Sequence, residues 1–511
     1  MKLCLLAAVV FLFVIYHVIK ILRRVLYQSK QLRHVPGPPM DNFILGNMSE
    51  MLSVPEELMN LSRRRNEEYG SIYKIWLFTI PFVLINEAKF AEVFFTSRHL
   101  RYKSIVYDFF QIWLGQGLLI SGGKNHQRQR KLFTPMFHFS ILNTFVDTFS
   151  DVAAALITRL RQMPDGTSVD IVTMFGEVAL DNICETSMGV KSNVPKIARM
   201  EYLHANERAT HTLMVRALKP WYWAEIIFKL LPTGQQLKRD LETIFQYNDE
   251  IINDRRRRLA VERMDDSRLD EGKSTGGRKN KTTLLDLLLD ESESASSPLD
   301  DNDLKVHVAT FMFGGHDTIT SAMSFILYIL GHHHEIQEKC YDELERIFNG
   351  SDRRPTTKDL QRMTYLEQVI KEGLRLFPSI PMVSRNVSQD IQMGDKYVVP
   401  AGAQIILQVY FLHRDPKYFP DPEKFDPDRF SPENSVGRHP FAYLPFAAGS
   451  RNCIGQKYAM LEAKVVFSYI LRNFRVESEG NLENLTIVFG LVTRSSKALR
   501  VKFKPRNDVD K

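Results

Sequence analysis

The sequence predicts a mainly α protein with a smaller β part, preceded by one N-terminal transmembrane helix. Three observations support this fold class. An almost wholly apolar run, Leu3–Leu22, opens the chain and is about long enough to cross a bilayer. Helical hydrophobic periodicity dominates the middle of the chain. Runs rich in β-branched and aromatic residues lie nearer the ends, at Ser71–Ile85 and Tyr397–Val409, and each predicts paired strands.

The apolar N-terminal run is interpreted as a membrane anchor. A basic segment that begins with Arg23 and Arg24 follows it, which places the rest of the chain in the cytosol by the positive-inside rule. A cleaved signal peptide is the rival interpretation, but only Lys2 precedes the run and no small-residue cleavage site follows it. Val35-Pro36-Gly37-Pro38-Pro39 then predicts a stiff elbow. The predicted parts are an anchor at 1–22, a basic and proline-rich hinge at 23–39 and one large domain at 40–511.

The composition argues against two classes of protein. The chain of 511 residues has a formal net charge of +7 and no nucleic-acid-binding motif, so the charge favours acidic protein surfaces or anionic membranes. Its four cysteines are scattered without a pairing framework, which argues against a disulfide-built secreted protein and for a reducing compartment.

Arg255–Arg258 is interpreted as a solvated helix end, and Met264–Thr282 as a solvated polar loop. His332–His334 cannot converge on one metal ion, because consecutive helical positions point in different directions.

The most informative motif is Phe446-Ala447-Ala448-Gly449-Ser450-Arg451-Asn452-Cys453-Ile454-Gly455, which precedes an apolar helical run. A helix N-terminus lowers the pKa of a cysteine placed there, and the resulting thiolate binds metals. Gly449 and Gly455 would let the backbone approach a flat cofactor, while Arg451 offers a cation to a carboxylate on it. A lone cysteine is more often a buried structural residue. The spacing of the phenylalanine, glycines, arginine and Cys453 favours a metal ligand instead.

A second motif lies in the middle of a helix expected over residues 300–330, whose acidic first turn suits the helix dipole. Gly314 and Gly315 weaken the helix but leave room for a cofactor or dioxygen against its backbone. The Thr318 hydroxyl is expected to bond back to the Gly314 carbonyl and to bend the helix, opening a groove. Asp317 and Thr318 then offer a carboxylate and a hydroxyl for proton delivery. A closely packed buried helix is the alternative interpretation.

These two motifs together resemble the haem-binding loop and the oxygen-binding groove of the cytochrome P450 superfamily. The resemblance implies the cytochrome P450 fold, a helix-rich domain around a buried haem b, and makes residues 40–511 a haem-binding monooxygenase domain. It implies Cys453 as the axial iron ligand and Asp317 and Thr318 as the catalytic acid and alcohol. It also implies that the following residues lie against the cofactor: Phe446, Gly449, Arg451, Gly455, Gly314 and Gly315.

Three segments resemble the fatty-acid-hydroxylating branch called family four: Phe311-Met312-Phe313, Gly315-His316-Asp317-Thr318 and Ile183-Cys184-Glu185-Thr186. That branch often carries a glutamate that esterifies a haem methyl, and this chain has Gly314 there. A haem held only by the thiolate and non-covalent contacts is therefore expected.

The resemblance also implies that Arg451, Arg385 and Arg130 bind the haem propionates, for which a planar guanidinium is well suited. His126 stands where the superfamily usually has a tryptophan. Imidazole can also donate an N–H, but it titrates near neutrality. The affinity for haem is therefore expected to depend on pH.

A structural ion network is expected around Glu372 and Arg375, which lie three residues apart on a helix and share a face. Exposed, such a pair would contribute almost nothing to stability. By resemblance, Arg429 in Pro427-Asp428-Arg429-Phe430 completes a buried network with this pair.

The implied function is a haem-thiolate monooxygenase that inserts one oxygen atom from O2 into an apolar substrate, such as a fatty acid, terpenoid, hormone or xenobiotic. No strand-anchored G-x-G-x-x-G motif for NADPH is present, so a separate NADPH-dependent diflavin reductase is expected, with cytochrome b5 as a further candidate partner. Microsomal members imply an endoplasmic reticulum membrane location with a cytosolic catalytic domain. By resemblance, the substrate pocket is expected to be lined by Tyr102–Gly117, Met214–Trp223, Phe311–Gly315, Ser379–Val383 and Phe489–Val492.

Two other classes of function stay open. A haem-thiolate isomerase or dehydratase needs no reductase and no proton relay. The presence of Asp317 and Thr318, which could form such a relay, argues against this class. A non-catalytic haem sensor would not need these two groups beside the bound gas.

Overall fold

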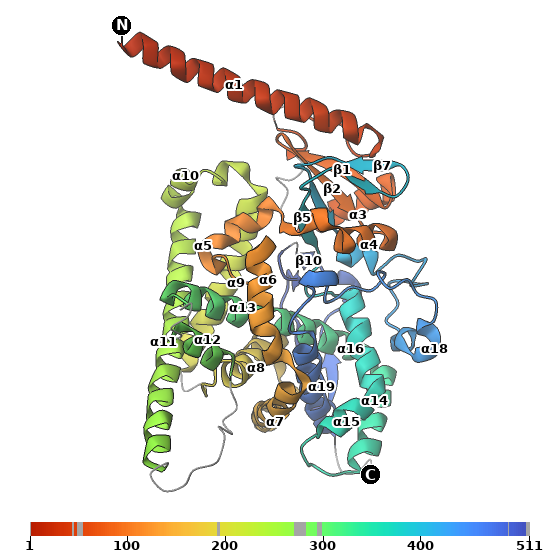
Figure 1. Ribbon diagram of the computed structural model, residues 1–511. Coiled ribbons are helices and arrows are strands. Elements are labelled where there is room, and N and C mark those ends of the chain that lie inside the picture. The colour runs from red at the N-terminus through yellow and green to blue at the C-terminus, as the bar shows by residue number, and fades with distance from the viewer. Residues whose placement is uncertain are drawn as a thin grey trace.

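A computed structural model describes residues 2–42, 45–48, 55–191, 195–269, 283–293, 299–488 and 490–506. Helices form most of the molecule, and the largest sheet lies at the end from which α1 projects (Figure 1). This confirms the mainly α class with a smaller β part. The helices are α1 (Lys2–Gln31), α3 (Pro55–Tyr69), α4 (Ala88–Thr96), α5 (Gln111–Leu114), α6 (Gly123–Phe133), α7 (Phe139–Arg161), α8 (Ile171–Thr186), α9 (Lys196–Leu218), α10 (Glu225–Leu230), α11 (Pro232–Leu269), α12 (Leu284–Ser292), α13 (Asp301–Leu330), α14 (His334–Phe348), α15 (Thr357–Arg362), α16 (Thr364–Leu376), α17 (Val409–Leu412), α18 (Pro432–Ser435) and α19 (Gln456–Asn473).

The largest sheet has five strands in the order β1-β2-β8-β5-β3. Smaller sheets pair β10 with β11, β6 with β7, and β12 with β4 and β9. The strands are β1 (Ile72–Leu77), β2 (Ile80–Ile85), β3 (Tyr102–Lys103), β4 (Ser168–Asp170), β5 (Val383–Asn386), β6 (Ile391–Met393), β7 (Tyr397–Val399), β8 (Gln404–Leu407), β9 (Phe474–Ser478), β10 (Ile487–Val488), β11 (Arg494–Ser495) and β12 (Arg500–Pro505).

One of the two predicted strand pairs is confirmed. β1 and β2 pair antiparallel, with Ile72 opposite Ile85. The predicted pairing within Tyr397–Val409 is wrong, because β7 pairs with β6 while β8 lies parallel to β2 and antiparallel to β5. The turn at Pro400-Ala401-Gly402, between β7 and β8, leads the chain from one sheet into another instead of closing a hairpin. Pairing of β8 with distant strands buries its apolar side chains, and local sequence does not encode that choice.

The N-terminal helix α1 projects from the strand-rich end of the molecule (Figure 1) and continues beyond Leu22 through the basic segment to Gln31. Its last turns lie against the body: Val25 is buried, and the Gln28 side-chain amide donates to the Ala401 carbonyl at 2.9 Å. The break comes at the predicted elbow, since Val35 and the prolines after it are not helical. The basic part of the predicted hinge is thus helical and docked.

Helix α13 forms the centre of the core. Asp300 caps its N-terminus by accepting a hydrogen bond from the Asp303 backbone N–H at 2.6 Å, which satisfies one of the unpaired donors there. The predicted span of 300–330 is confirmed. Most side chains from Leu304 to Leu330 are buried on all faces, so α13 is enclosed by other helices. Within the described residues, α7 is also long and apolar enough to cross a membrane, but it is a partly buried core helix.

Two surface predictions change in the structure. Helix α11 extends to Leu269, so the first part of the predicted polar loop is helical, and residues 270–282 lie outside the described residues. Arg255 is buried rather than solvated and forms an ion pair with Asp286 at 2.7 Å. Arg255 therefore joins α11 to α12, a tertiary contact that the charge run did not reveal.

Candidate functional site

The Cys453 loop is a strained turn held by its own backbone. The Cys453 N–H donates to the Phe446 carbonyl at 2.9 Å, and α19 begins just after Gly455. Ala447 and Gly449 have positive φ angles of 57° and 69°. At Gly449 a side chain would also meet the Phe95 carbonyl oxygen at 2.8 Å, so only glycine fits. The loop therefore presents the cysteine in a fixed position.

Cys453 is an exposed cysteine, whereas Cys184 and Cys340 are buried. Its predicted low pKa is wrong for the protein alone. Solvent reaches the Cys453 side chain, but its sulfur lies in a recess among protein atoms, and this desolvation raises the pKa of Cys453, although the Gly455 backbone N–H and the Arg130 guanidinium lower it. The backbone at the start of α19 lowers the Cys453 pKa as expected, but desolvation raises it by more. Cys453 is then expected to lose its proton when a metal cation binds, because a metal ion deprotonates the thiol that coordinates it.

In α13 the two glycines have different surroundings. Apart from the backbone of α13 itself, no atom of the described residues lies within 4 Å of where a Gly314 side chain would begin, so this position faces open space. A side chain at Gly315 would meet the Ile183 side chain at 2.4 Å, so Gly315 is a packing glycine against α8. The Thr318 hydroxyl donates to the Gly314 carbonyl at 2.9 Å, as predicted. The open groove lies on the Gly314 side.

The Cys453 loop and α13 are brought together by an aromatic bridge. A side chain at Gly455 would be 3.9 Å from both the Cys453 sulfur and the Phe137 ring. The Phe137 ring stacks on Phe311, with centroids 6.1 Å apart. Phe311 precedes Gly314 by three residues and so lies on the same helix face. The thiol and the open side of α13 therefore border one region.

Beside this region lies a cationic cluster, defined here as Lys103, Arg385 and Arg451. Burial, followed by Arg385 and Arg451, holds the pKa of Lys103 well below its usual value. Burial and then Arg385 lower the pKa of Arg451 to about 10. No carboxylate of the described residues is among the groups that shift these pKa values. Three basic side chains gathered in one place fit a dianionic ligand, such as the two propionates of haem, whose charge would favour their protonated forms.

Lys103 is a residue that sequence reasoning missed. It lies on the short strand β3, whose partner β5 places it directly opposite Arg385. No local motif marks it, and only the sheet register brings it beside the predicted arginine. Arg385 itself is buried and donates to the Ser384 carbonyl at 2.9 Å.

Arg130 lies at the Cys453 loop. Its guanidinium donates to the Asn452 carbonyl at 2.6 Å and to the Asn452 side-chain oxygen at 2.7 Å. This bidentate contact holds the residue directly before the cysteine. Arg451 in turn donates to the Ser121 carbonyl. Both arginines thereby tie the Cys453 loop to the segment 121–130.

His126 lies next to these cations, and its predicted titration near neutrality is wrong. Burial, then Arg451, Arg130, Lys103 and Arg385, lower the pKa of His126 to about 4. The imidazole is consequently neutral at physiological pH and can serve as an N–H donor without a change of charge.

The lowered pKa of His126 predicts a pH effect on stability. Between pH 6.5 and about 4 the unfolded chain binds a proton that the folded protein excludes, so His126 makes unfolding easier as pH falls through this window. We expect His126→Trp to lose less unfolding free energy than the parent between pH 7 and 4.5, measured by urea denaturation. Haem retention between pH 6.5 and 8 should have the same pH dependence in both proteins. The prediction of equal pH dependence would be contradicted if the parent released haem more readily below pH 7.5 than above it and the variant showed no such change.

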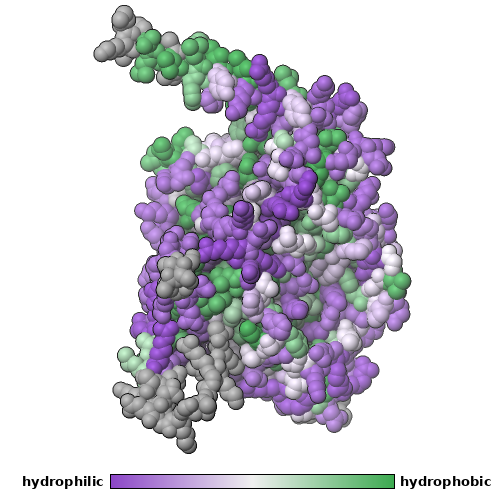
Figure 2. Space-filling view, in the orientation of Figure 1, coloured by the Kyte–Doolittle hydropathy of each residue, from purple (hydrophilic) through white to green (hydrophobic). Residues whose placement is uncertain are grey.

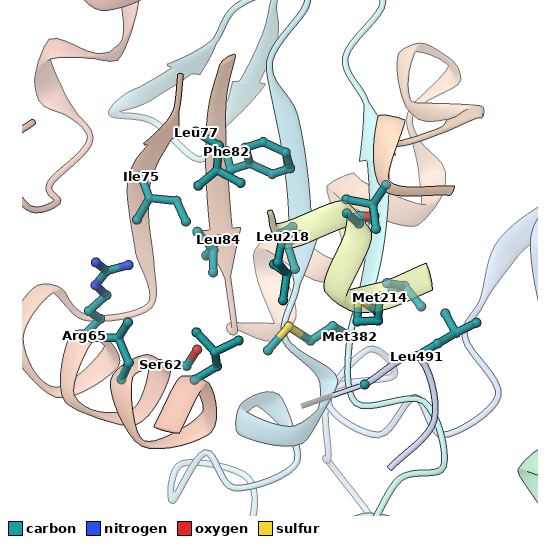
Figure 3. A pocket seen from close by; sticks show the side chains of 18 of the residues that line it. Ser62, Arg65, Ile75, Leu77, Phe82, Leu84, Met214, Leu218, Met382 and Leu491 are labelled. Carbon is teal, nitrogen blue, oxygen red and sulfur yellow. The ribbon is translucent and has the colours of Figure 1, made fainter. Parts of the chain in front are cut away.

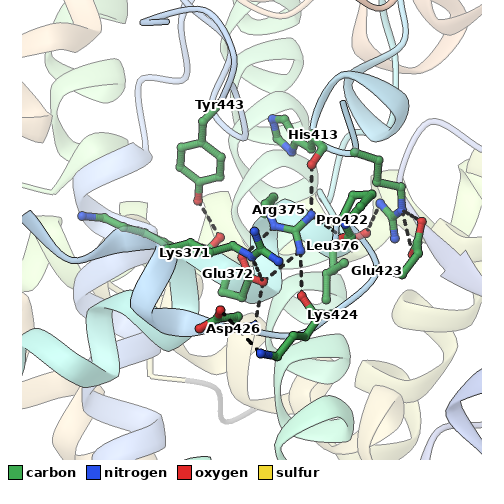
Figure 4. A network of polar contacts seen from close by, with 12 residues as sticks. Lys371, Glu372, Arg375, Leu376, His413, Pro422, Glu423, Lys424, Asp426 and Tyr443 are labelled. Atoms are coloured by element: carbon green, nitrogen blue, oxygen red, sulfur yellow. Dashed lines mark hydrogen bonds and ion pairs between the residues drawn. The ribbon is translucent and has the colours of Figure 1, made fainter. Parts of the chain in front are cut away.

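The ion network around Arg375 is buried (Figure 4). Both Glu372 and Arg375 have fully buried side chains and share two hydrogen bonds of 2.7 and 2.8 Å. Arg429 lies 3.5 Å from the Glu372 carboxylate. Arg375 also donates to the His413 carbonyl at 3.0 Å, and the His413 ring accepts from the Leu444 N–H at 2.7 Å. The network therefore supports the segment that leads into the Cys453 loop.

A mostly apolar pocket lies between α3, the β1–β2 hairpin and the end of α9 (Figure 3). Four of the five segments predicted to form the pocket contribute to its lining, through residues such as Val106, Met214, Met382 and Leu491. Phe311–Gly315 does not line it, and Phe489 lies outside the described residues. The sequence did not predict the walls formed by α3 and by β1–β2.

The family of the chain follows from comparison with known proteins. A cytochrome P450 family model matches residues 36–503. The chain belongs to the cytochrome P450 family. This cytochrome P450 is 38% identical over 486 residues to cytochrome P450 4c3 of Drosophila melanogaster, an alignment that covers 94% of this chain and 90% of that protein. It is 37% identical over 495 residues to cytochrome P450 4V2 of Homo sapiens, with 96% and 94% covered.

The fold of this cytochrome P450 is similar to that of a solved structure titled cytochrome P450DA heme domain. The TM-score is 0.76 at 23% identity, and the match covers 93% of this chain and 99% of that one. The expected fold is thereby confirmed, and the family-four names of the relatives agree with the predicted branch. The protein is a haem-dependent monooxygenase.

Proposed function

We propose that this cytochrome P450 inserts one oxygen atom from O2 into a C–H bond of an apolar substrate, using electrons from NADPH delivered by a separate diflavin reductase. Cytochrome b5 is a further candidate donor. The observation that carries the proposal is the exposed Cys453 thiol, linked through Phe137 and Phe311 to the open Gly314 side of α13. The cationic cluster beside this region matches a dianionic cofactor.

Each residue of the site has a proposed role. When bound, the haem supplies the iron that activates dioxygen. Cys453 would hold the iron, to which its thiolate would supply electron density. The cationic cluster binds the propionates, joined by the neutral His126. Gly314 leaves room against the helix backbone. Asp317 and Thr318 would hold and pass protons at this turn of α13.

The substrate class rests on the cavity of Figure 3, whose lining is almost entirely aliphatic and aromatic. Such a lining favours an apolar chain or ring system over a polar metabolite. Arg65 and Ser62 lie at one end of it. Fatty acids are the first class to test, followed by terpenoids, hormones and xenobiotics.

The test is product analysis after reconstitution of the purified protein with diflavin reductase, NADPH and a panel of these compounds. Hydroxylated product that requires both reductase and NADPH supports the proposal. A protein that forms the thiolate-type carbon monoxide complex and converts a hydroperoxide without reductase, but hydroxylates nothing, would favour the isomerase or dehydratase class.

Haem is expected to be bound non-covalently, because Gly314 has no carboxylate. Acidic organic extraction after turnover should remove all haem from the parent protein. Gly314→Glu adds a carboxylate on the open side of α13, and a measurable share of its haem is expected to stay with the protein. Gly314→Gln has the same size without the carboxylate, so it should release haem like the parent. Haem retained by the parent would refute the prediction.

We propose that α1 anchors the protein in the endoplasmic reticulum membrane. Exposed apolar side chains follow the helix, among them Leu5, Phe11 and Leu12. Figure 2 shows hydrophobic surface along it. A second exposed apolar patch lies on α10, where Ile226 is 80% and Leu230 73% exposed. Protease treatment of intact microsomes should degrade the catalytic domain and leave a short N-terminal fragment. Protection of the whole chain would exclude a cytosolic orientation.

A further inference from the structure

A carboxyl group lies in the core between α8 and α19 without a cation beside it. The Glu462 side chain of α19 is fully buried, and it forms no ion pair with any described residue. Its Oε1 accepts a hydrogen bond at 2.7 Å from the side-chain amide of Asn182 on α8, which is fully buried as well. The buried Glu372 carboxylate, by contrast, is matched by the Arg375 guanidinium. Glu462 therefore needs another way to offset its charge.

Each member of this pair has one further oxygen without a partner. Glu462 Oε2 and Asn182 Oδ1 are both buried, and neither has a hydrogen-bond partner among the described residues. Both oxygens are acceptors when the carboxyl group is ionised. A proton on Oε2 turns that oxygen into a donor, so that a carboxylic acid and an amide bond to each other reciprocally. One proton thus satisfies both atoms and removes a buried charge that has no counter-ion.

The groups around the pair from α7 and α8 carry no opposing charge. The Thr186 hydroxyl of α8 lies 2.9 Å from the Tyr458 hydroxyl of α19. The Phe145 and Phe149 rings of α7 pack against Tyr458, with centroids 6.1 and 5.1 Å away. Burial, followed by the Glu462 charge, holds the pKa of Tyr458 well above its usual value, so this phenol offers no charge of its own.

The other helices packed against α19 do not supply a cation either. Lys464, two positions beyond Glu462, donates to Glu367 of α16 at 2.6 Å. Burial raises the pKa of Glu462 to about 8, against the effect of the Asn182 hydrogen bond, and no charged group from the described parts of α13, α14 or α16 contributes. The raised pKa agrees with the unpartnered oxygens, since both favour the neutral acid.

The pair joins two helices that support the haem site. Helix α19 begins directly after the Cys453 loop, and α8 packs against α13 where Ile183 meets Gly315. We propose that Glu462 is a neutral carboxylic acid at physiological pH and that its reciprocal hydrogen bonds with Asn182 form a proton-dependent latch between α8 and α19. In alkaline solution the proton is lost, an unpaired charge remains in the core, and the helix behind the Cys453 loop is loosened. This inference goes beyond the proposed function and holds for any reaction at the site.

The first test detects the proton directly. Infrared spectra of the parent minus E462Q should contain a carboxylic-acid carbonyl band at pH 6 that is lost at pH 9.5. Asn182→Leu removes the acceptor of the acid proton and should shift the frequency of this band. E343Q is the matched control, because Glu343 is also buried but accepts the Tyr365 and Leu366 N–H groups at 2.7 and 3.0 Å. Absence of the band at pH 6 would overturn the proposal and indicate an ionised carboxylate bridged by water.

The second test uses the pH dependence of stability. The folded protein keeps the Glu462 proton up to about pH 8, whereas the unfolded chain releases it near pH 4.5, so stability falls as pH rises through this window. E462Q imitates the protonated acid at every pH. The thermal unfolding midpoint of haem-loaded E462Q should exceed that of the parent by a margin that grows from pH 5.5 to 8 and then stays constant. A margin that does not change with pH would overturn the proposal.

The third test asks whether the latch supports the haem site. Transfer of haem from the full-length protein to an excess of a haem-scavenging protein is followed at pH 7 and pH 9.5. Transfer should accelerate in the parent between these two pH values and should accelerate less in E462Q, whose amide pair stays intact. Comparison of the two proteins cancels the effects of other titrating groups. Equal acceleration in both proteins would overturn the latch.

Discussion

Replacement of Cys453 by alanine is expected to abolish the thiolate-type carbon monoxide spectrum and to reduce hydroxylation by more than about 100-fold. Changes in groups that merely support a metal ligand commonly cost about 10–100-fold, and this substitution removes the ligand itself. No other described cysteine can substitute, because Cys184 and Cys340 are buried in the core. The reduced, carbon-monoxide-bound absorption spectrum and product formation are the two measurements.

Cys340→Ala is the matched control for this substitution, since it removes a thiol from α14 with the same change in size. It should keep the parent spectrum and at least half of the activity, with a lower unfolding midpoint because a small cavity is left. Cys453→Ala protein that retains the thiolate-type spectrum would show that another residue ligates the iron.

Replacement of Arg375 by leucine is expected to have the largest effect on stability. It leaves the fully buried Glu372 carboxylate without its cation, and removes the donors to the His413, Pro422 and Lys424 carbonyls. Breaking a buried pair in this way costs about 3–5 kcal/mol, a large part of the roughly 5–15 kcal/mol by which proteins are stable. Because His413 supports Leu444 ahead of the Cys453 loop, haem content should fall as well.

Urea unfolding and the haem-to-protein ratio measure this prediction. Glu423→Gln is the control, because it breaks the pair with Arg414 at 3.0 Å but its carboxylate is 64% exposed. It should cost less than about 1 kcal/mol. Adding Glu372→Gln to Arg375→Leu should recover part of the lost stability, since it neutralises the stranded charge. A single variant as stable as the control would contradict the predicted role of the network.

Features encoded over a few residues could be predicted from the sequence. The Asp300 cap, the span of α13, the bond from Thr318 to Gly314 and the turn before α19 depend on neighbours within about one helical turn. Backbone sterics and local hydrogen bonds decide them.

Features that depend on distant segments could not be predicted. Lys103 joins the cationic cluster through the β3–β5 register. The pKa of His126 lies below its solution value because the side chain is desolvated. The pKa of Cys453 is raised because desolvation has a larger effect than the dipole of the helix that follows. Strand β8 found its partners in other parts of the chain, so the predicted local hairpin did not form.

The sequence by itself determined the family, the haem cofactor and the main fold class, because the Cys453 loop and the α13 motif are each encoded within a few consecutive residues. Only the tertiary structure decided which charges meet. Arg494 reaches Asp317 from 177 positions further along the chain, and the cavity draws its walls from segments between Leu58 and Leu491. The physical reason is that desolvation and Coulomb interactions depend on distance in space, and the folded chain sets that distance.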